Sequence, residues 1–209
     1  YVSEYMPDYD GVFAHGVGYL SSSLKHAGHK VSLIHITKEI GREEYVESLM
    51  REKPDLVAFS LFSHQFGLVQ KLAHFTKEAG KFSTIAGGVH PTVAPEETLN
   101  EKNIDMVCIG EGEEALEELC DKMDHGRDYR KVESIWVNDN GNMIRNRIRP
   151  LNINLESRPF PDRSIFDFKK LSDTRLGMLT VLAGRGCPYD CTYCCNHQYK
   201  RIYSNAGKY

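Results

Sequence analysis

The stretch LVAFSLFSHQFGLVQKLAHFTKEAGKFSTIAGG, residues 56–88, decides the fold class of this chain. It begins with an apolar run of strand length, residues 56–61, and closes with a second run, residues 82–86. Between the two runs, residues 64–79 place apolar side chains at a spacing near 3.6, which predicts an amphipathic helix that ends at Gly80. A strand, a helix and a second strand in this order predict a βαβ unit with parallel strands.

The same alternation continues on both sides of this stretch. We expect helices over residues 17–27, 43–51 and 113–123, and strands over residues 31–36 and 106–109. A further strand should precede the first helix, and only residues 1–6 are available for it. Residues 1–125 are therefore predicted to form an α/β domain with a doubly wound, Rossmann-like or flavodoxin-like parallel sheet.

The pattern changes after residue 125. Residues 134–137 and 143–147 flank Asn140-Gly141, a dipeptide that favours a tight hairpin. Two prolines predict an extended linker over residues 150–161, so residues 126–165 are expected to hold a hairpin and a linker. A short helix expected over 164–171 leads into the rest, residues 166–209, which is expected to contain an apolar strand over 178–183.

Composition and charge exclude several classes of function. With 26 basic and 29 acidic residues, the net charge is −3, so a nucleic-acid partner is not expected. Small acids and cofactors are the expected partners instead. No apolar stretch approaches the ~20 residues of a membrane-spanning helix, and no signal sequence opens the chain, which predicts a cytoplasmic protein. The chain starts at Tyr1 without methionine and stops at Tyr209, so we also expect it to be a fragment.

Cysteines carry the most specific chemical signal. Residues 184–200 read GRGCPYDCTYCCNHQYK and place Cys187, Cys191 and Cys194 in a C-x-x-x-C-x-x-C array. Three thiolates in one short loop predict an iron-sulfur cluster, because a cubane held by three cysteines keeps one iron open for a ligand. Two alternatives stay open: a zinc ion completed by Cys195 or His197, and a redox-active C-x-x-C pair.

The cysteine spacing, with Tyr193 just before the third cysteine, resembles the signature of the radical S-adenosylmethionine enzymes. The resemblance implies a [4Fe-4S] cluster on Cys187, Cys191 and Cys194, with S-adenosylmethionine at its open iron and Tyr193 among the cofactor contacts. It further implies an electron donor such as flavodoxin or ferredoxin, and a 5'-deoxyadenosyl radical that removes hydrogen from an unactivated carbon. Residues 178–183 would then be the first strand of a truncated (β/α) barrel.

Three loops follow the predicted strands of the first domain. They read SLFSHQ from Ser60, GGVHPT from Gly87 and GEGE from Gly110. In open α/β sheets ligands bind outside the carboxyl ends of the strands, and adjacent glycines would let a bulky ligand approach the backbone. Taken singly, the second loop could be a simple turn and the third the start of a helix.

Together these loops resemble those of cobalamin-binding domains, although Phe62 stands where that family usually has leucine. The resemblance implies a corrinoid contacted by eight residues: Ser60, Leu61, Ser63, Gly87, Gly88, His90, Glu111 and Gly112. The family's Asp-x-His-x-x-Gly loop is absent, because Asp10 and His15 are wrongly spaced for it. The implied corrinoid is therefore base-off, without a histidine beneath cobalt.

The whole chain thus resembles the cobalamin-dependent radical S-adenosylmethionine enzymes. That resemblance implies a methyltransferase, or a cyclase or related radical reaction at carbon, acting on a small molecule. One alternative is a methylthiotransferase, which needs three further cysteines for a second cluster, whereas only Cys108 and Cys120 are available and both are predicted to be buried thiols. The other is a corrinoid-binding module without catalysis of its own.

Overall fold

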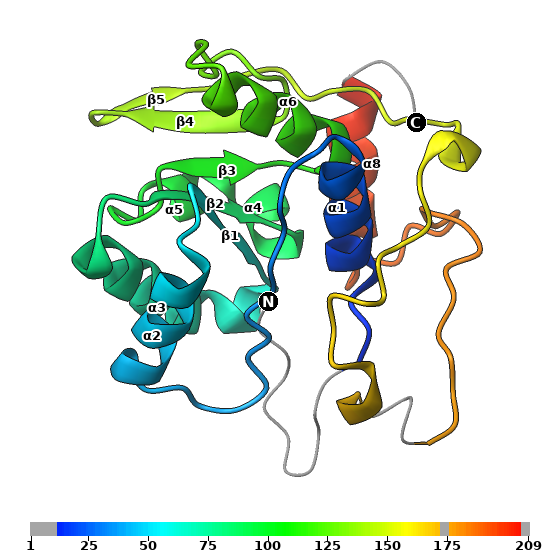
Figure 1. Cartoon of the computed structure of the whole chain (residues 1–209). Helices are drawn as coiled ribbons and strands as arrows, with labels where there is room; N and C mark the ends of the chain where they lie inside the picture. Colours follow the sequence, from blue (N-terminus) through cyan, green and yellow to red (C-terminus); the bar gives the residue numbers. More distant parts are fainter. Residues whose placement is uncertain (1–11, 172–175, 206–209) are drawn as a thin grey trace.

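The computed structural model describes residues 12–171 and 176–205 and shows an α/β fold around one five-stranded sheet (Figure 1). The strands are β1 Leu56–Ser60, β2 Ser83–Gly87, β3 Met106–Cys108, β4 Ile135–Asp139 and β5 Asn142–Ile144. The helices are α1 His15–His26, α2 Arg42–Glu52, α3 Phe66–Ala79, α4 Val89–Val93, α5 Pro95–Leu99, α6 Glu113–Asp124 and α8 Asn196–Asn205. Short 3-10 turns are η1 Ser63–Gln65, η2 Leu155–Ser157 and η3 Phe168–Lys170.

The sheet has the order β1-β2-β3-β4-β5, with β1 to β3 parallel and β4 and β5 antiparallel. The register places Ser60 of β1 opposite Gly87 of β2, so the loops after these strands leave the same edge. The predicted hairpin is confirmed: Asn140 and Gly141 both have positive φ, 53° and 88°, as a tight primed turn requires. The hairpin pairs with β3 and makes the sheet mixed.

Helices cover both faces of the sheet, as a doubly wound fold requires. Alternate residues of the strands face opposite sides. Phe59, Ala86 and Val107 pack into a core with α2 and α3, whereas Ile85 and Met106 pack into a second core with α1 and α6. Figure 1 shows α2 and α3 on one side of the sheet and α6 on the other. The predicted fold class is confirmed.

Two predicted strands are absent from the described residues. Within 31–36 only Ile36 forms an isolated bridge, and a cavity of about 420 Å³ is lined by both this segment and β1. Residues 178–183 pair with no described strand and leave Met178, Leu179 and Val181 more than half exposed. Strand formation requires a partner backbone, and an apolar run cannot supply one by itself. The expected strand over residues 1–6 lies outside the described residues.

Some helices were not predicted. The GGVHPT loop continues into α4 and α5, the second of which starts with proline at its first position, where the missing amide costs nothing. Helix α8 follows the cysteines directly. The helix expected over 164–171 shrinks to the three residues of η3. Among the described helices, none has the length and apolar character needed to cross a membrane.

The linker is fastened to α1 by one carboxylate. Asp162 accepts hydrogen bonds from Ser21 Oγ at 2.7 Å and Lys25 Nζ at 2.6 Å, and its own amide donates to Gly18 O at 2.9 Å. Phe13 and Phe166 pack edge to face beside this contact, with ring centroids 5.1 Å apart. The chain beyond the linker is thereby brought back past α1, toward the carboxyl edge of the sheet (Figure 1).

Candidate cofactor site at the carboxyl edge of the sheet

The loops after β1 and β2 are bound to each other through their backbones. Leu61 N donates to Gly87 O at 3.1 Å, and His90 N donates to Leu61 O at 3.3 Å. Gly88 has φ +101°, and a Cβ there would lie 2.9 Å from Leu61 O. A side chain at Gly88 would therefore meet the protein's own backbone, so glycine is required here by the packing of the two loops.

His90 is the most unusual polar side chain at this edge. Its Nδ1 lies 3.1 Å from Ser63 Oγ, and its ring centroid lies 4.3 Å from that of Phe66. The residue is only 5% exposed, yet its Nε2 has no hydrogen-bond partner among the described residues. Burial lowers the pKa of His90 despite the opposing charge of Glu97, so the imidazole is held in its neutral form with one nitrogen free to bind.

Thr92 joins the loop after β3 to the loop after β2. Its Oγ1 donates to Gly88 O at 2.7 Å and accepts from Gly110 N at 3.0 Å. The hydroxyl of Tyr199, from α8, also hydrogen bonds to the Thr92 side chain. One threonine thus connects three segments that are far apart in the sequence.

Helix α8 packs against the part of this edge that follows β3. The Tyr203 hydroxyl accepts a hydrogen bond from Glu111 N at 2.6 Å, and the tyrosine is 4% exposed. Gly110 has φ +81°, and a Cβ there would lie 2.1 Å from the Tyr203 hydroxyl, so only glycine fits. Figure 1 shows α8 behind α1, at the end of the sheet where β3 leads into α6.

The cavity of about 420 Å³ is a separate feature. It lies between residues 28–36 and β1, and Ser60 is the only predicted site residue among those that line it. The predicted site residues therefore meet at the carboxyl edge, which α8 contacts at Thr92, Gly110 and Glu111, and not around this cavity.

Arg185 connects the cysteine loop to the same edge. Its Nη1 lies 3.0 Å from Glu111 Oε1, and its Nη2 lies 2.6 Å from Glu113 Oε1. The guanidinium also stacks over Tyr19 of α1, with Cζ 4.8 Å from the ring centroid. The Glu113 side chain is 6% exposed and that of Arg185 21%, so the pairing is largely shielded from water.

The cysteines themselves are only loosely arranged. Cys191 is exposed, Cys187 and Cys194 are partly buried, and a turn is closed by Cys194 N donating to Cys191 O at 3.1 Å. Tyr193 points into solvent and is 91% exposed. Over residues 12–171 and 176–205, no three His, Cys, Asp or Glu side chains are grouped so that they could hold a metal ion.

Most of the predicted cofactor residues do come together. Hydrogen bonds connect Leu61 with Gly87 and His90, and His90 with Ser63. Gly88 packs against Leu61, and Ser60 pairs with Gly87 across the sheet. Glu111 joins them through its neighbour Gly110, whereas Gly112 packs under α1, its Cβ position 3.2 Å from Leu20. The Glu111 carboxylate is engaged by Arg185.

Sequence reasoning missed three residues that organise this edge: Thr92, Arg185 and Tyr203. Thr92 and Arg185 were visible in the two loop motifs, but their partners lie 18 and 72 or more positions away. The signal for Tyr203 was weaker. It consisted of the helical spacing of Tyr199, Ile202 and Tyr203, which places them on one face of a helix. Proximity between segments this distant cannot be read from local pattern.

The chain is similar to known proteins along most of its length. It is 25% identical over 197 residues to the anaerobic magnesium-protoporphyrin IX monomethyl ester cyclase of Rubrivivax gelatinosus, covering 90% of this chain and 35% of the cyclase. It is 29% identical over 143 residues to a putative methylthiotransferase of Methanocaldococcus jannaschii, covering 66% of this chain and 29% of that protein. The chain thus spans about a third of the length of these relatives.

Among solved structures, the cobalamin-dependent S-adenosylmethionine radical enzyme OxsB, with aqua-cobalamin and S-adenosylmethionine bound, superposes with a TM-score of 0.74 at 25% identity. The superposition covers 92% of this chain and 27% of OxsB. The family model of the B12 binding domain matches residues 12–120, which include the loops after β1, β2 and β3. This chain belongs to the B12 binding domain family, and its relatives include cobalamin-dependent radical S-adenosylmethionine enzymes.

Proposed function

We propose that this chain binds a corrinoid at the carboxyl edge of its sheet and serves a cobalamin-dependent radical S-adenosylmethionine enzyme. The observation that carries this proposal is the convergence of three loops, after β1, β2 and β3, on one hydrogen-bonded surface with the free Nε2 of His90 buried within it. A buried nitrogen without a partner is costly, and a polar ligand would satisfy it.

The donor set at this edge suits the polar periphery of a corrinoid. Hydroxyls come from Ser60 and Ser63, and the neutral imidazole of His90 can donate or accept one hydrogen bond at Nε2. The other residues proposed to contact it are Leu61, Gly87, Gly88, Glu111 and Gly112. When bound, the corrinoid would supply a cobalt centre able to carry a methyl group. Tyr199 and Tyr203 would shield the loop amides from water.

The cluster is proposed on the spacing of the cysteines. Cys187, Cys191 and Cys194 would ligate a [4Fe-4S] cluster with S-adenosylmethionine at its open iron, and Tyr193 would lie against that cofactor. An electron donor such as flavodoxin or ferredoxin would reduce the cluster in the cytoplasm, where all six cysteines could stay unpaired as they are here. The proposed reaction is methyl transfer or a cyclisation at carbon of a small molecule.

The methylthiotransferase alternative is disfavoured by the surroundings of the remaining cysteines. Cys108 is 4% exposed, and burial together with the charge of Glu113 raises the pKa of its thiol to about 12. Burial also raises the pKa of Cys120 to about 11. A second cluster needs three further cysteines, and outside the cysteine loop only Cys108 on β3 and Cys120 on α6 remain. A corrinoid-binding module without catalysis stays a second candidate, because residues 178–183 form no strand of a barrel.

Binding of hydroxocobalamin tests the proposal. We expect one equivalent to bind to the purified chain, measured by equilibrium dialysis and by the corrinoid absorption spectrum. Ser63→Trp places a large side chain at the exposed rim of the edge and should weaken binding at least tenfold. Ser32→Trp is the matched control, because Ser32 is equally exposed and lines the separate cavity instead.

The two variants distinguish the outcomes. Binding that survives Ser63→Trp and is lost in Ser32→Trp would place the ligand in the cavity and overturn the assignment. Absence of binding to the unmodified chain would overturn the proposed function itself.

A further inference from the structure

The cysteine loop, residues 187–195, is attached to the corrinoid-binding edge by the residues on both sides of it. Before the loop, Arg185 binds the carboxylates of Glu111 and Glu113. After the loop, Tyr203 of α8 accepts a hydrogen bond from the amide of Glu111. Both flanks therefore meet one residue, Glu111, which stands at the carboxyl end of β3 among the proposed corrinoid contacts.

Arg185 makes three contacts on the side of the loop that precedes the cysteines. The preceding residues 178–182 are exposed. Among them, Thr180 O accepts a hydrogen bond from Arg163 Nη2 at 2.6 Å, five residues before Arg185. Two carboxylates and one aromatic ring fix the guanidinium from three sides, and a planar guanidinium held in this way has little freedom to move. Cys187 follows only two residues later.

We propose that Arg185, held by Glu111 and Glu113, is a positioning residue that sets the distance between the cysteine loop and the corrinoid-binding edge. The inference rests on the proposed function, since it concerns the spacing of the two cofactors. Chemistry shared between two cofactors depends steeply on their separation, and an ion pair shielded from water between them defines that separation better than a flexible loop does.

The test compares Arg185→Gln/Glu113→Gln with the unmodified protein, both reconstituted anaerobically with iron, sulfide and hydroxocobalamin. The double substitution removes the arginine without leaving Glu113 buried and unpaired. Glu111→Gln is a second variant, which weakens the same contact while keeping the fold of the loop. Arg147→Gln is the control, because Arg147 makes an ion pair with Glu133 at an exposed site.

The readout is the distance distribution between cobalt(II) and the reduced cluster, measured by pulsed electron paramagnetic resonance. We expect iron and cobalamin content to stay near one cluster and one corrinoid in Arg185→Gln/Glu113→Gln and in Arg147→Gln. Because Glu111 is itself a proposed corrinoid contact, Glu111→Gln is measured with cobalamin in excess. The distribution should broaden in Arg185→Gln/Glu113→Gln and in Glu111→Gln, and stay narrow in Arg147→Gln. Hydrogen exchange of residues 186–195 should rise about tenfold in the same two variants, while that of β1 to β3 stays unchanged.

Failure of this inference and failure of the proposed function give different results. If the unmodified protein binds neither cofactor, the proposed function fails. If both cofactors bind and the cobalt-cluster distribution is the same in all variants, Arg185 does not position the loop and the inference is overturned.

Discussion

At the scale of single residues, Gly88 shows how the backbone restricts the site. A side chain at Gly88 would need the strained φ of +101° and would place Cβ 2.9 Å from Leu61 O. We expect Gly88→Ala to lower the free energy of unfolding by about 1–3 kcal/mol, because both strain and overlap must be relieved. Urea unfolding followed by circular dichroism measures this change.

Gly67→Ala is the control, for which we expect the free energy of unfolding to change in the opposite direction. Gly67 lies within α3, is exposed and has open space around its Cβ position. Alanine should stabilise this helix by roughly 0.5–1 kcal/mol. If Gly88→Ala were as stable as the unmodified protein, the close packing of the loops after β1 and β2 would be wrong.

The three cysteines of the proposed cluster can be separated from their neighbour Cys195. Cys187→Ala, Cys191→Ala and Cys194→Ala should each reduce iron and sulfide content after anaerobic reconstitution to near background, because three thiolates hold the cubane. Cys195→Ala should leave the content unchanged. Iron binding that depended on Cys195 and tolerated Cys191→Ala would favour the mononuclear alternative.

At the scale of elements, the contact between the linker and α1 predicts a pH dependence. Burial disfavours the ionised form of Asp162, but the hydrogen bonds from Lys25, Ser164 and Ser21 outweigh burial and hold the pKa of this carboxyl well below its usual range. A pKa depressed in the folded state contributes stability above the unfolded value of about 4, and the contribution is lost as the pH falls below it.

Asp162→Asn should therefore destabilise the protein at pH 7 by roughly 1–3 kcal/mol, and the difference from the unmodified protein should shrink below about pH 4. The measurement is the free energy of unfolding in urea at a series of pH values. Asp167→Asn, which removes an exposed ion pair with Lys170, serves as the control and should change stability little. A difference that stayed constant down to pH 2 would contradict the role of the Asp162 charge.

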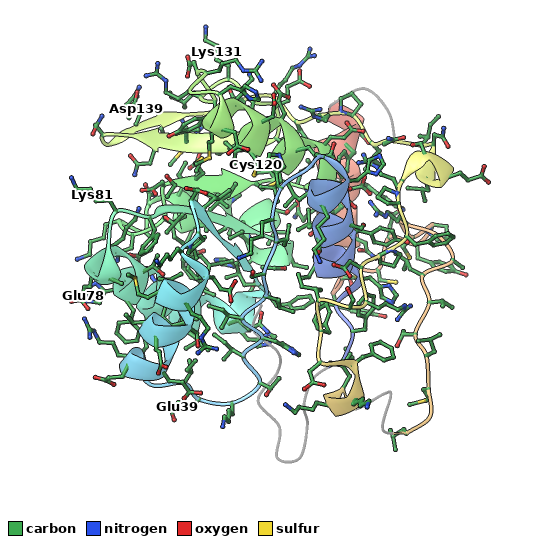
Figure 2. The ribbon with its side chains drawn as sticks, in the orientation of Figure 1. Glu39, Glu78, Lys81, Cys120, Lys131 and Asp139 are labelled. Carbon is green, nitrogen blue, oxygen red and sulfur yellow. The ribbon has the colours of Figure 1, made fainter. Side chains whose placement is uncertain are left out.

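At the scale of the whole molecule, the cysteines differ in how deeply they are buried. Cys191 is exposed in the loop, Cys120 is partly buried on α6 (Figure 2), and Cys108 is enclosed in the sheet. Thiolates react with alkylating reagents, so the raised pKa values of Cys108 and Cys120, about 12 and about 11, add to their lack of access.

In the iron-free chain at pH 7.5, we expect iodoacetamide to modify Cys191 first, Cys120 much later and Cys108 only after unfolding. Peptide mass spectrometry over a time course measures the order, and the same reaction in 6 M guanidinium should remove the differences. Modification of Cys108 at the rate of Cys191 in the folded protein would show that the core between β3 and α6 is open.

Local pattern by itself determined the βα alternation, the Asn140-Gly141 turn and the cysteine array, because each depends on residues within one or two turns of chain. The carboxyl-edge loops were also predictable, since parallel strands bring their ends to one edge. Only the tertiary structure decided that residues 31–36 form no more than an isolated bridge at Ile36 and that residues 178–183 form no strand, because an apolar run forms a strand only beside another backbone. It also decided that Arg185 meets Glu111 and that Tyr203 covers Gly110, since contacts across about 70 to 90 residues arise from how the elements pack and leave no periodic signal in the sequence.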